Sequence, residues 1–138
     1  MAMILASQSP RRRELLGQMG FSFTVRPARG EELPHPELTP AQLVEELARQ
    51  KALEVSAGAD ADDVVVAADT VVAVDGTVLG KPRDRAHAAE MLSALSGREH
   101  TVYTGVAVKR GEKLLVEFFS VVSRSVSCAS LNIVESMY

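Results

Sequence analysis

The sequence predicts an α/β fold in which one mixed, twisted sheet is flanked by helices. Three observations lead to this prediction: strand-like apolar runs alternate with amphipathic, helix-like stretches, an Asp-Gly pair indicates a hairpin, and the composition is globular. The chain has 138 residues, of which 46% are apolar and 24% charged. We expect one domain over residues 1–138, because a chain of this length buries roughly two-thirds of its unfolded surface.

The first half of the chain is expected to hold three strands and two helices. Ser9 and Pro10 have the residue types of an N-cap and a first helical position, and Thr39-Pro40 repeats that pattern. In chain order we expect a strand at Met3–Ala6, a helix to about Gly20 with Leu15, Leu16 and Met19 on one stripe, a weak strand at Phe21–Arg26, a proline-rich loop at 27–40, a helix to about Ala57, and a strand starting at Val64.

The second half begins with an apolar run, Val64–Ala68, which fits a strand buried on both faces. The strand is expected to pass through Asp69-Thr70 into 71–74, and Asp75-Gly76 is the strongest hairpin signal in the chain. The remaining expected elements are a return strand at Thr77–Leu79, a helix from Asp84 to Gly97, strands at His100–Val108 and Lys113–Phe119, and a further strand over the first half of 120–138.

Composition excludes several function classes. The formal net charge of −3 argues against a nucleic-acid groove. Cys128 is the only cysteine, so neither a disulfide framework nor a cysteine zinc site is expected. No apolar run approaches the roughly 20 residues of a membrane span, and the short apolar N-terminal stretch precedes its arginines, the reverse of a secretory signal. We therefore expect a soluble, cytoplasmic chain.

Two cations lie on the apolar faces of the expected helices. On a helical wheel that starts at Leu43, Lys51 falls at about 80°, in the middle of the apolar stripe. Either its stem packs while the amine reaches solvent, or the amine points at an anion near the sheet. Arg12 falls within the stripe of the first helix and points toward the sheet, and Arg11 flanks that stripe.

The start of the first helix has the features of an anion site. Ser7, Ser9 and the arginines lie beside backbone amides that have no helical partner, which favours phosphate. The alternative is a solvated basic first turn, which the helix dipole disfavours.

Carboxylates complete the pattern. Asp69 is expected at the end of an apolar strand, where an unpaired charge is costly and where open α/β sheets bind ligands. Its alternative role is to cap a turn at Thr70. Glu32 could be an ordinary solvated acid, and Lys81 could be either a surface residue or part of the site. Together these groups suit a polyphosphate with a divalent metal, which indicates phosphate hydrolysis.

These residues also resemble the Maf family of nucleoside triphosphate pyrophosphatases. The resemblance covers about residues 3–117, in order and at the family's spacing. It is carried by Leu5-Ala6-Ser7-Gln8-Ser9-Pro10-Arg11-Arg12, Glu14-Leu15-Leu16, Glu31-Glu32, Ala48-Arg49-Gln50-Lys51-Ala52, Ala68-Asp69-Thr70-Val71, Asp75-Gly76, Leu79-Gly80-Lys81-Pro82, Leu95-Ser96-Gly97 and His100-Thr101-Val102.

The resemblance implies an inosine-triphosphatase-like fold and hydrolysis of dTTP or UTP to the monophosphate and pyrophosphate, by metal-assisted water attack on the α-phosphorus. It makes Asp69 the general base, and Glu32 and Asp69 the ligands of Mg²⁺ or Mn²⁺. The positions that it assigns to the substrate are Ser7, Ser9, Arg11, Arg12, Lys51, Thr70 and Lys81, with Arg11 and Thr70 separating the dTTP/UTP subfamily from relatives that cleave 7-methyl-GTP.

The chain departs from the family after residue 117. Members continue into a helical segment and a motif Asp-Lys-Ala-Gly-Ala-Tyr-Gly-x-Gln-Gly, which this sequence lacks, so we expect a C-terminally truncated chain. The alternative function is a weak or inactive nucleotide-binding protein with a regulatory role in septum control. The related inosine-triphosphate-cleaving branch is disfavoured because it lacks the Ser-x-Ser-Pro-Arg-Arg motif. Whether the chain forms a homodimer stays open.

Overall fold

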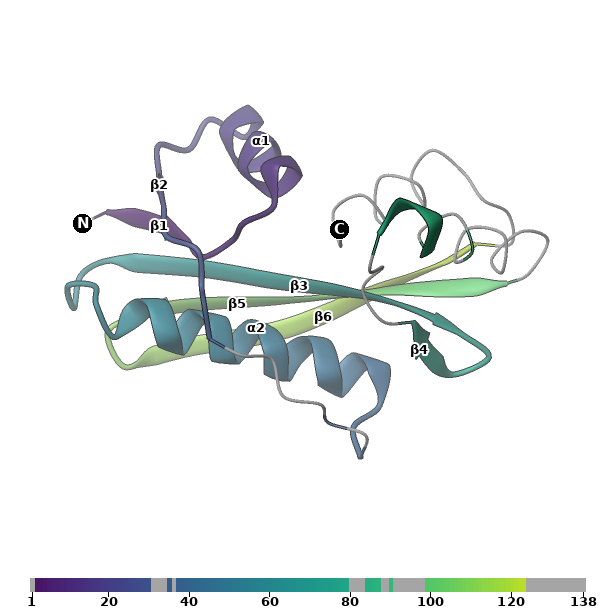
Figure 1. Cartoon of the computed structure of the whole chain (residues 1–138). Helices are drawn as coiled ribbons and strands as arrows, with labels where there is room; N and C mark the ends of the chain where they lie inside the picture. The colour runs from purple at the N-terminus through teal and green to yellow at the C-terminus, as the bar shows by residue number, and fades with distance from the viewer. Residues whose placement is uncertain are drawn as a thin grey trace.

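A mixed sheet forms the centre of the computed structural model, which describes residues 2–30, 35, 37–79, 84–87, 90 and 99–123 (Figure 1). Its strand order is β2-β1-β3-β5-β6, and β4 pairs with β3 off this path. The sheet and its flanking helices confirm the predicted fold class. The strands are β1 (Met3–Leu5), β2 (Thr24–Val25), β3 (Val64–Val74), β4 (Thr77–Leu79), β5 (His100–Arg110) and β6 (Lys113–Ser123), and the helices are α1 (Pro10–Gln18) and α2 (Pro40–Ser56).

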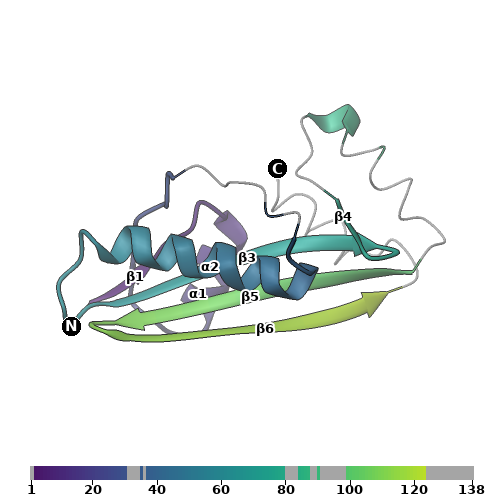
Figure 2. The same ribbon diagram turned by 90° about the horizontal axis from the view of Figure 1, so that it is seen from below.

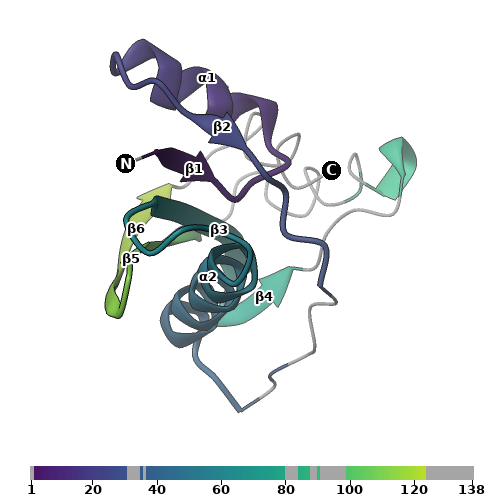
Figure 3. The same cartoon turned by 90° about the vertical axis from the view of Figure 1, so that its left-hand side faces the viewer.

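Three long strands carry the sheet. β3, β5 and β6 have 11 residues each and pair antiparallel, whereas the three-residue β1 pairs parallel with β2 and β3. Figure 2 shows α2 lying along these long strands. Figure 3 shows α1 and α2 on opposite sides of β1. The described sheet is therefore mixed, and α1 and α2 lie on opposite sides of it at β1.

The core lies between α2 and one face of β3 and β5. Its buried members include Ala48 and Ala52 of α2, Val65 and Ala67 of β3, and Ala107 of β5. Burial alternates along β3 from Val64 to Asp69. The prediction that this run is buried on both faces is therefore wrong, because only one of its faces packs against α2.

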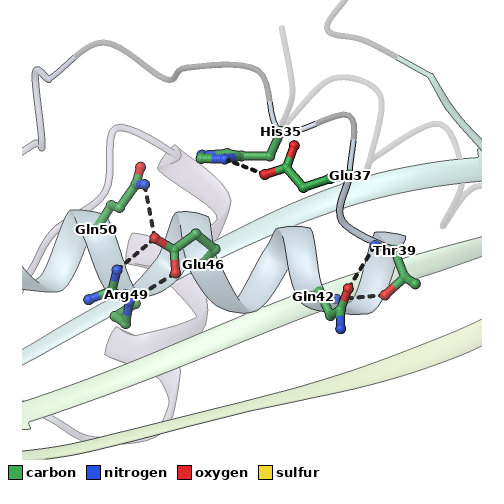
Figure 4. A network of polar contacts seen from close by, with 7 residues as sticks. All are labelled: His35, Glu37, Thr39, Gln42, Glu46, Arg49 and Gln50. Atoms are coloured by element: carbon green, nitrogen blue, oxygen red, sulfur yellow. Dashed lines mark hydrogen bonds and ion pairs between the residues drawn. The ribbon is translucent and has the colours of Figure 1, made fainter.

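Both predicted helix starts are confirmed. Ser9 caps α1 by accepting a hydrogen bond from the Arg12 amide, and Pro10 occupies the first turn. Thr39 and Gln42 form a reciprocal capping box at the start of α2 (Figure 4). The apolar stripe expected on α1 does not pack into the core: no residue of α1 is buried, and Met19 beyond its end is 69% exposed.

The hairpin at Asp75-Gly76 is also confirmed, with positive φ angles of 51° and 79° that suit these two residue types. β2 is shorter than the predicted strand at 21–26, and β6 extends to Ser123, which confirms strand structure at the start of 120–138. Of the helix predicted from Asp84 to Gly97, the structure describes Asp84 and helical residues at 85–87 and 90. Residues 88–89 and 91–97 lie outside the described residues, as do residues 124–138. In the described part of the chain, no helix is long and apolar enough to span a membrane.

Candidate functional site

The candidate site lies where β1 ends and β3 continues. β1 pairs with Val64–Val66, and the Ala6 amide adds one further bond to the Val66 carbonyl at 2.8 Å. On the same edge of β3, β4 starts to pair only at Val72. Within the described residues, β3 therefore has no strand neighbour on this edge between Ala67 and Val71. We call this stretch the open edge of β3.

Asp69 lies in the middle of β3. The expectation that the strand passes through Asp69-Thr70 into 71–74 is confirmed, and the expectation that Asp69 ends a strand is wrong. The ladder with β5 continues through it, pairing Asp69 with Gly105 and Thr70 with Thr104. The strand neighbour β5 on one side is enough to keep the chain extended at Asp69. Asp69 meets the open edge because β1 is short and β3 is long.

A fixed loop leads from β1 into α1 beside this open edge. The Ser9 amide donates to Ser7 Oγ at 3.0 Å, and the Arg12 amide donates to Ser9 Oγ at 3.3 Å. Both serines are buried. The N-terminus of α1 is thereby held next to the strand, whereas Arg11, the first of the arginines, is exposed.

Arg12 reaches the open edge with its guanidinium. Nη1 donates to the Ala68 carbonyl at 3.2 Å and Nη2 donates to Thr70 Oγ1 at 2.8 Å. The predicted orientation of Arg12 toward the sheet is therefore confirmed. Burial lowers the pKa of Arg12, and the nearby Asp69 carboxylate opposes that shift. An arginine remains protonated at neutral pH under such conditions, so this is a fixed cation.

Lys51 reaches the same stretch of β3 from α2. Its Nζ lies 3.0 Å from Asp69 Oδ1, and the two side chains are 20% and 7% exposed. The amine therefore ends at a buried carboxylate rather than in solvent, which decides between the two interpretations of Lys51. The ion pair also offsets the free-energy cost of burying the Asp69 carboxylate.

The two cations approach from opposite faces of the sheet. Consecutive residues of a strand point to opposite faces, so Asp69 and Thr70 face different sides of β3. Lys51 binds the first and Arg12 binds the second. Each cation was expected to point toward the sheet, and both converge on Ala68–Thr70, with α1 supplying Arg12 and α2 supplying Lys51.

Two predicted site residues, Glu32 and Lys81, lie outside the described residues. Arg29 and Gly30 are the last described residues before Glu32. The Arg29 amide donates to Glu54 Oε2 at 2.7 Å, and the Gly30 amide donates to Glu54 Oε1 at 2.5 Å. α2 thus anchors the segment that leads to Glu32.

Two residues of β5 contribute to the site and were not predicted. Thr104 Oγ1 lies 3.2 Å from Thr70 Oγ1. Gly105 lies under α2, where a side chain would overlap the Val44 carbonyl. The sequence did carry a signal for both, because Thr104-Gly105 interrupts the apolar alternation of this strand.

The donor chemistry fits a metal that is shared with a phosphate ligand. Among the described residues, no group of three or more His, Cys, Asp and Glu side chains could hold an ion by itself. Asp69 is a single carboxylate, and in the described part of the chain only its Oδ1 accepts a hydrogen bond. Mg²⁺ is commonly bound by one or two carboxylates together with substrate phosphates and water. Asp69 suits that mode.

Sequence comparison links the chain to a family and to named enzymes. The model of the family described as Maf-like protein matches residues 2–134. A dTTP/UTP pyrophosphatase of Pelotomaculum thermopropionicum is 56% identical over 105 residues, which are 76% of this chain and 54% of the relative. A dTTP/UTP pyrophosphatase of Anaeromyxobacter dehalogenans is 50% identical over 130 residues, which are 94% of this chain and 64% of the relative. The chain thus spans about half to two-thirds of the length of these relatives.

Solved structures share the fold at low sequence identity. The Ham1 protein of Staphylococcus aureus has a TM-score of 0.60 and 14% identity, with 90% of this chain and 71% of that chain covered. A nucleoside-triphosphatase, also titled dITP/XTP pyrophosphatase, of Mycobacterium abscessus has a TM-score of 0.57 and 21% identity, with 90% and 74% covered. These similarities support the fold class predicted from the sequence.

Proposed function

The chain belongs to the Maf family, and from that premise we propose that it hydrolyses a nucleoside triphosphate, dTTP or UTP, to the monophosphate and pyrophosphate. The relatives' names support the reaction class. The observation that carries the proposal is the buried Asp69 carboxylate, paired with Lys51 at the open edge of β3 and close to the Arg12 cation.

Phosphate binding is assigned to the cations and to the start of α1. Arg12 has five N–H groups, of which two are used by acceptors in the described part of the chain, so others can meet phosphate oxygens. The Ser7–Ser9 loop holds the helix N-terminus, whose dipole favours an anion. Lys51 would add a second cation from the other face. Arg11 and Lys81 are the remaining proposed substrate contacts. Thr70 is the proposed specificity position.

Asp69 is the proposed general base. A water oxygen forms a bond to the α-phosphorus while its proton passes to the Asp69 carboxylate. The bond between the α-phosphorus and the bridging oxygen breaks, and pyrophosphate leaves with that oxygen. Lys51 holds the carboxylate in position before the reaction, with its Nζ 3.0 Å from Asp69 Oδ1. Asp69 and Glu32 would hold Mg²⁺ or Mn²⁺, which neutralises phosphate charge when it is bound.

Pyrophosphate release tests this proposal. The chain is incubated with dTTP, UTP or 7-methyl-GTP in the presence of Mg²⁺, and we expect release from dTTP or UTP. Asp69→Asn should lower the rate by about 10²–10⁴, the usual contribution of a general base. Asp62→Asn, at an exposed aspartate outside the site, is the matched control. A folded chain that releases pyrophosphate from none of the three would contradict hydrolysis, and full activity in Asp69→Asn would contradict the assigned base.

A second candidate function is nucleotide binding without turnover. It is favoured by the pairing of Lys51 with Asp69, because a phosphate could bind Arg12 and the helix N-terminus while the base remains paired. Binding of dTTP without pyrophosphate release would support this function. In either case Arg12→Ala should weaken dTTP binding, because both functions assign phosphate to its guanidinium, and unchanged affinity would place the phosphates elsewhere.

A further inference from the structure

The Thr70 hydroxyl lies between two partners on the side of the sheet that faces α1. Arg12 Nη2 is 2.8 Å from Thr70 Oγ1, and Thr104 Oγ1 is 3.2 Å away from the same atom. An arginine has donors and no acceptor, so Thr70 must accept from Arg12. The single proton of the Thr70 hydroxyl is then available to Thr104.

Thr104 is the direct cross-strand neighbour of Thr70 in the register of β3 and β5. A threonine on a strand can exchange its hydroxyl and methyl positions by rotating to another staggered rotamer. A hydroxyl on the opposite residue favours the rotamer that turns Thr70 Oγ1 toward it, and that same position is the one that Arg12 contacts. Thr104 therefore selects the Thr70 rotamer, and among the described residues no hydrogen bond joins Thr104 to Arg12 directly.

We propose that Thr104 is a positioning residue of the nucleotide site: through Thr70 it fixes the plane of the Arg12 guanidinium. The proposal rests on the proposed function for its effect on the substrate. The second anchor of Arg12, the Ala68 carbonyl, is a backbone atom and persists without Thr104. One remaining hydrogen bond lets the guanidinium rotate, whereas two define its plane and the direction of its other N–H groups.

Thr104→Val tests the proposal, because valine keeps the shape of the side chain and removes the hydroxyl. We expect the KM for dTTP to rise about tenfold, the equivalent of one hydrogen bond, while kcat changes little. Thr104→Ser, which restores the hydroxyl, should return KM to near the wild-type value. Thr101→Val is the matched control on the same strand, since the Thr101 hydroxyl makes no hydrogen bond with a described residue. Equal KM values for Thr104→Val and wild type would overturn the proposal.

A second readout is independent of activity. Nitrogen-15 NMR of the arginine side chains reports exchange of the Arg12 guanidinium protons, which should be faster in Thr104→Val than in wild type and in Thr104→Ser. If the valine variant does not fold, Thr104→Ala serves in the same comparison. Unchanged Arg12 signals in a folded variant overturn the positioning role. Altered Arg12 signals in a chain that releases no pyrophosphate support the role and contradict only the proposed function.

Discussion

Replacing Gly105 by alanine should separate α2 from the sheet at the candidate site. Gly105 lies opposite Asp69 in the register of β3 and β5. A Cβ added there would overlap the carbonyl carbon and oxygen of Val44 and would lie 2.9 Å from the Glu45 amide nitrogen. All three are backbone atoms of a hydrogen-bonded helix, so no side-chain rotation relieves the contact. α2 must retreat by about 1 Å to restore ordinary van der Waals separation.

The expected loss of stability follows from this overlap. Overpacking of a well-packed contact costs about 1–3 kcal/mol. For a chain of this size we expect that cost to lower the Tm by about 4–10 °C. The same displacement of α2 moves Lys51, which lies seven residues after Val44 in this helix. Lys51 Nζ is 3.0 Å from Asp69 Oδ1 before the substitution. Pyrophosphate release should therefore fall together with the Tm.

Gly17→Ala is the matched control for this substitution. Gly17 lies within α1, and a Cβ added there would meet no atom within 4 Å. Alanine should stabilise that helix by about 0.5–1 kcal/mol. The two substitutions thus have opposite expected signs for the same added methyl group. A Tm for Gly105→Ala within about 1 °C of wild type would refute the close seating of α2 on β5.

Two further predictions concern α2. Hydrogen bonds from Arg49 lower the pKa of Glu46 (Figure 4), and the side chains of Arg49 and Glu46 are 42% and 27% exposed. The pair therefore stabilises the fold at pH values above the ordinary pKa of Glu46. This contribution is lost as the pH falls through the lowered pKa. Arg49→Met should therefore cost about 0.3–0.5 kcal/mol in urea unfolding at pH 7, and that cost should shrink as the pH falls through the lowered pKa of Glu46. A cost that does not change with pH would exclude the pair as its cause. Glu54→Ala should speed hydrogen exchange of the Arg29 and Gly30 amides about tenfold, and unchanged exchange would show that Glu54 does not hold them.

Local signals in the sequence predicted the secondary structure well. Ser9 and Thr39 start their helices because a side-chain oxygen satisfies a free backbone amide, which depends on neighbours in sequence only. Asp75-Gly76 forms its turn because both residue types tolerate positive φ. The helical wheel placed Lys51 and Arg12 toward the sheet for a similar reason, since helix periodicity is a local property.

Strand pairing was the part that local signals could not provide. The number of residues over which β1 accompanies β3 depends on contacts between segments about 60 residues apart. The sequence pattern predicted that the strand continues through Asp69, but it could not predict that the neighbouring strand β1 ends before this residue. The same reasoning explains why Thr104 and Gly105 were missed, because their importance comes from what lies across the sheet and above it.

The mismatch between a three-residue strand and an 11-residue strand explains how this sheet can hold a site. If β1 accompanied β3 along its full length, the Ala68 carbonyl would be occupied by a backbone amide and Arg12 would have no place at the edge. Because β1 stops, the edge is open there, and groups on both faces of β3 can approach a ligand at that edge. Arg12 does so from the side of α1, and Lys51 from the side of α2. The short β1 and the serine-held turn that follows it therefore bring two cations and one buried carboxylate to the edge at which we propose the phosphate chain binds.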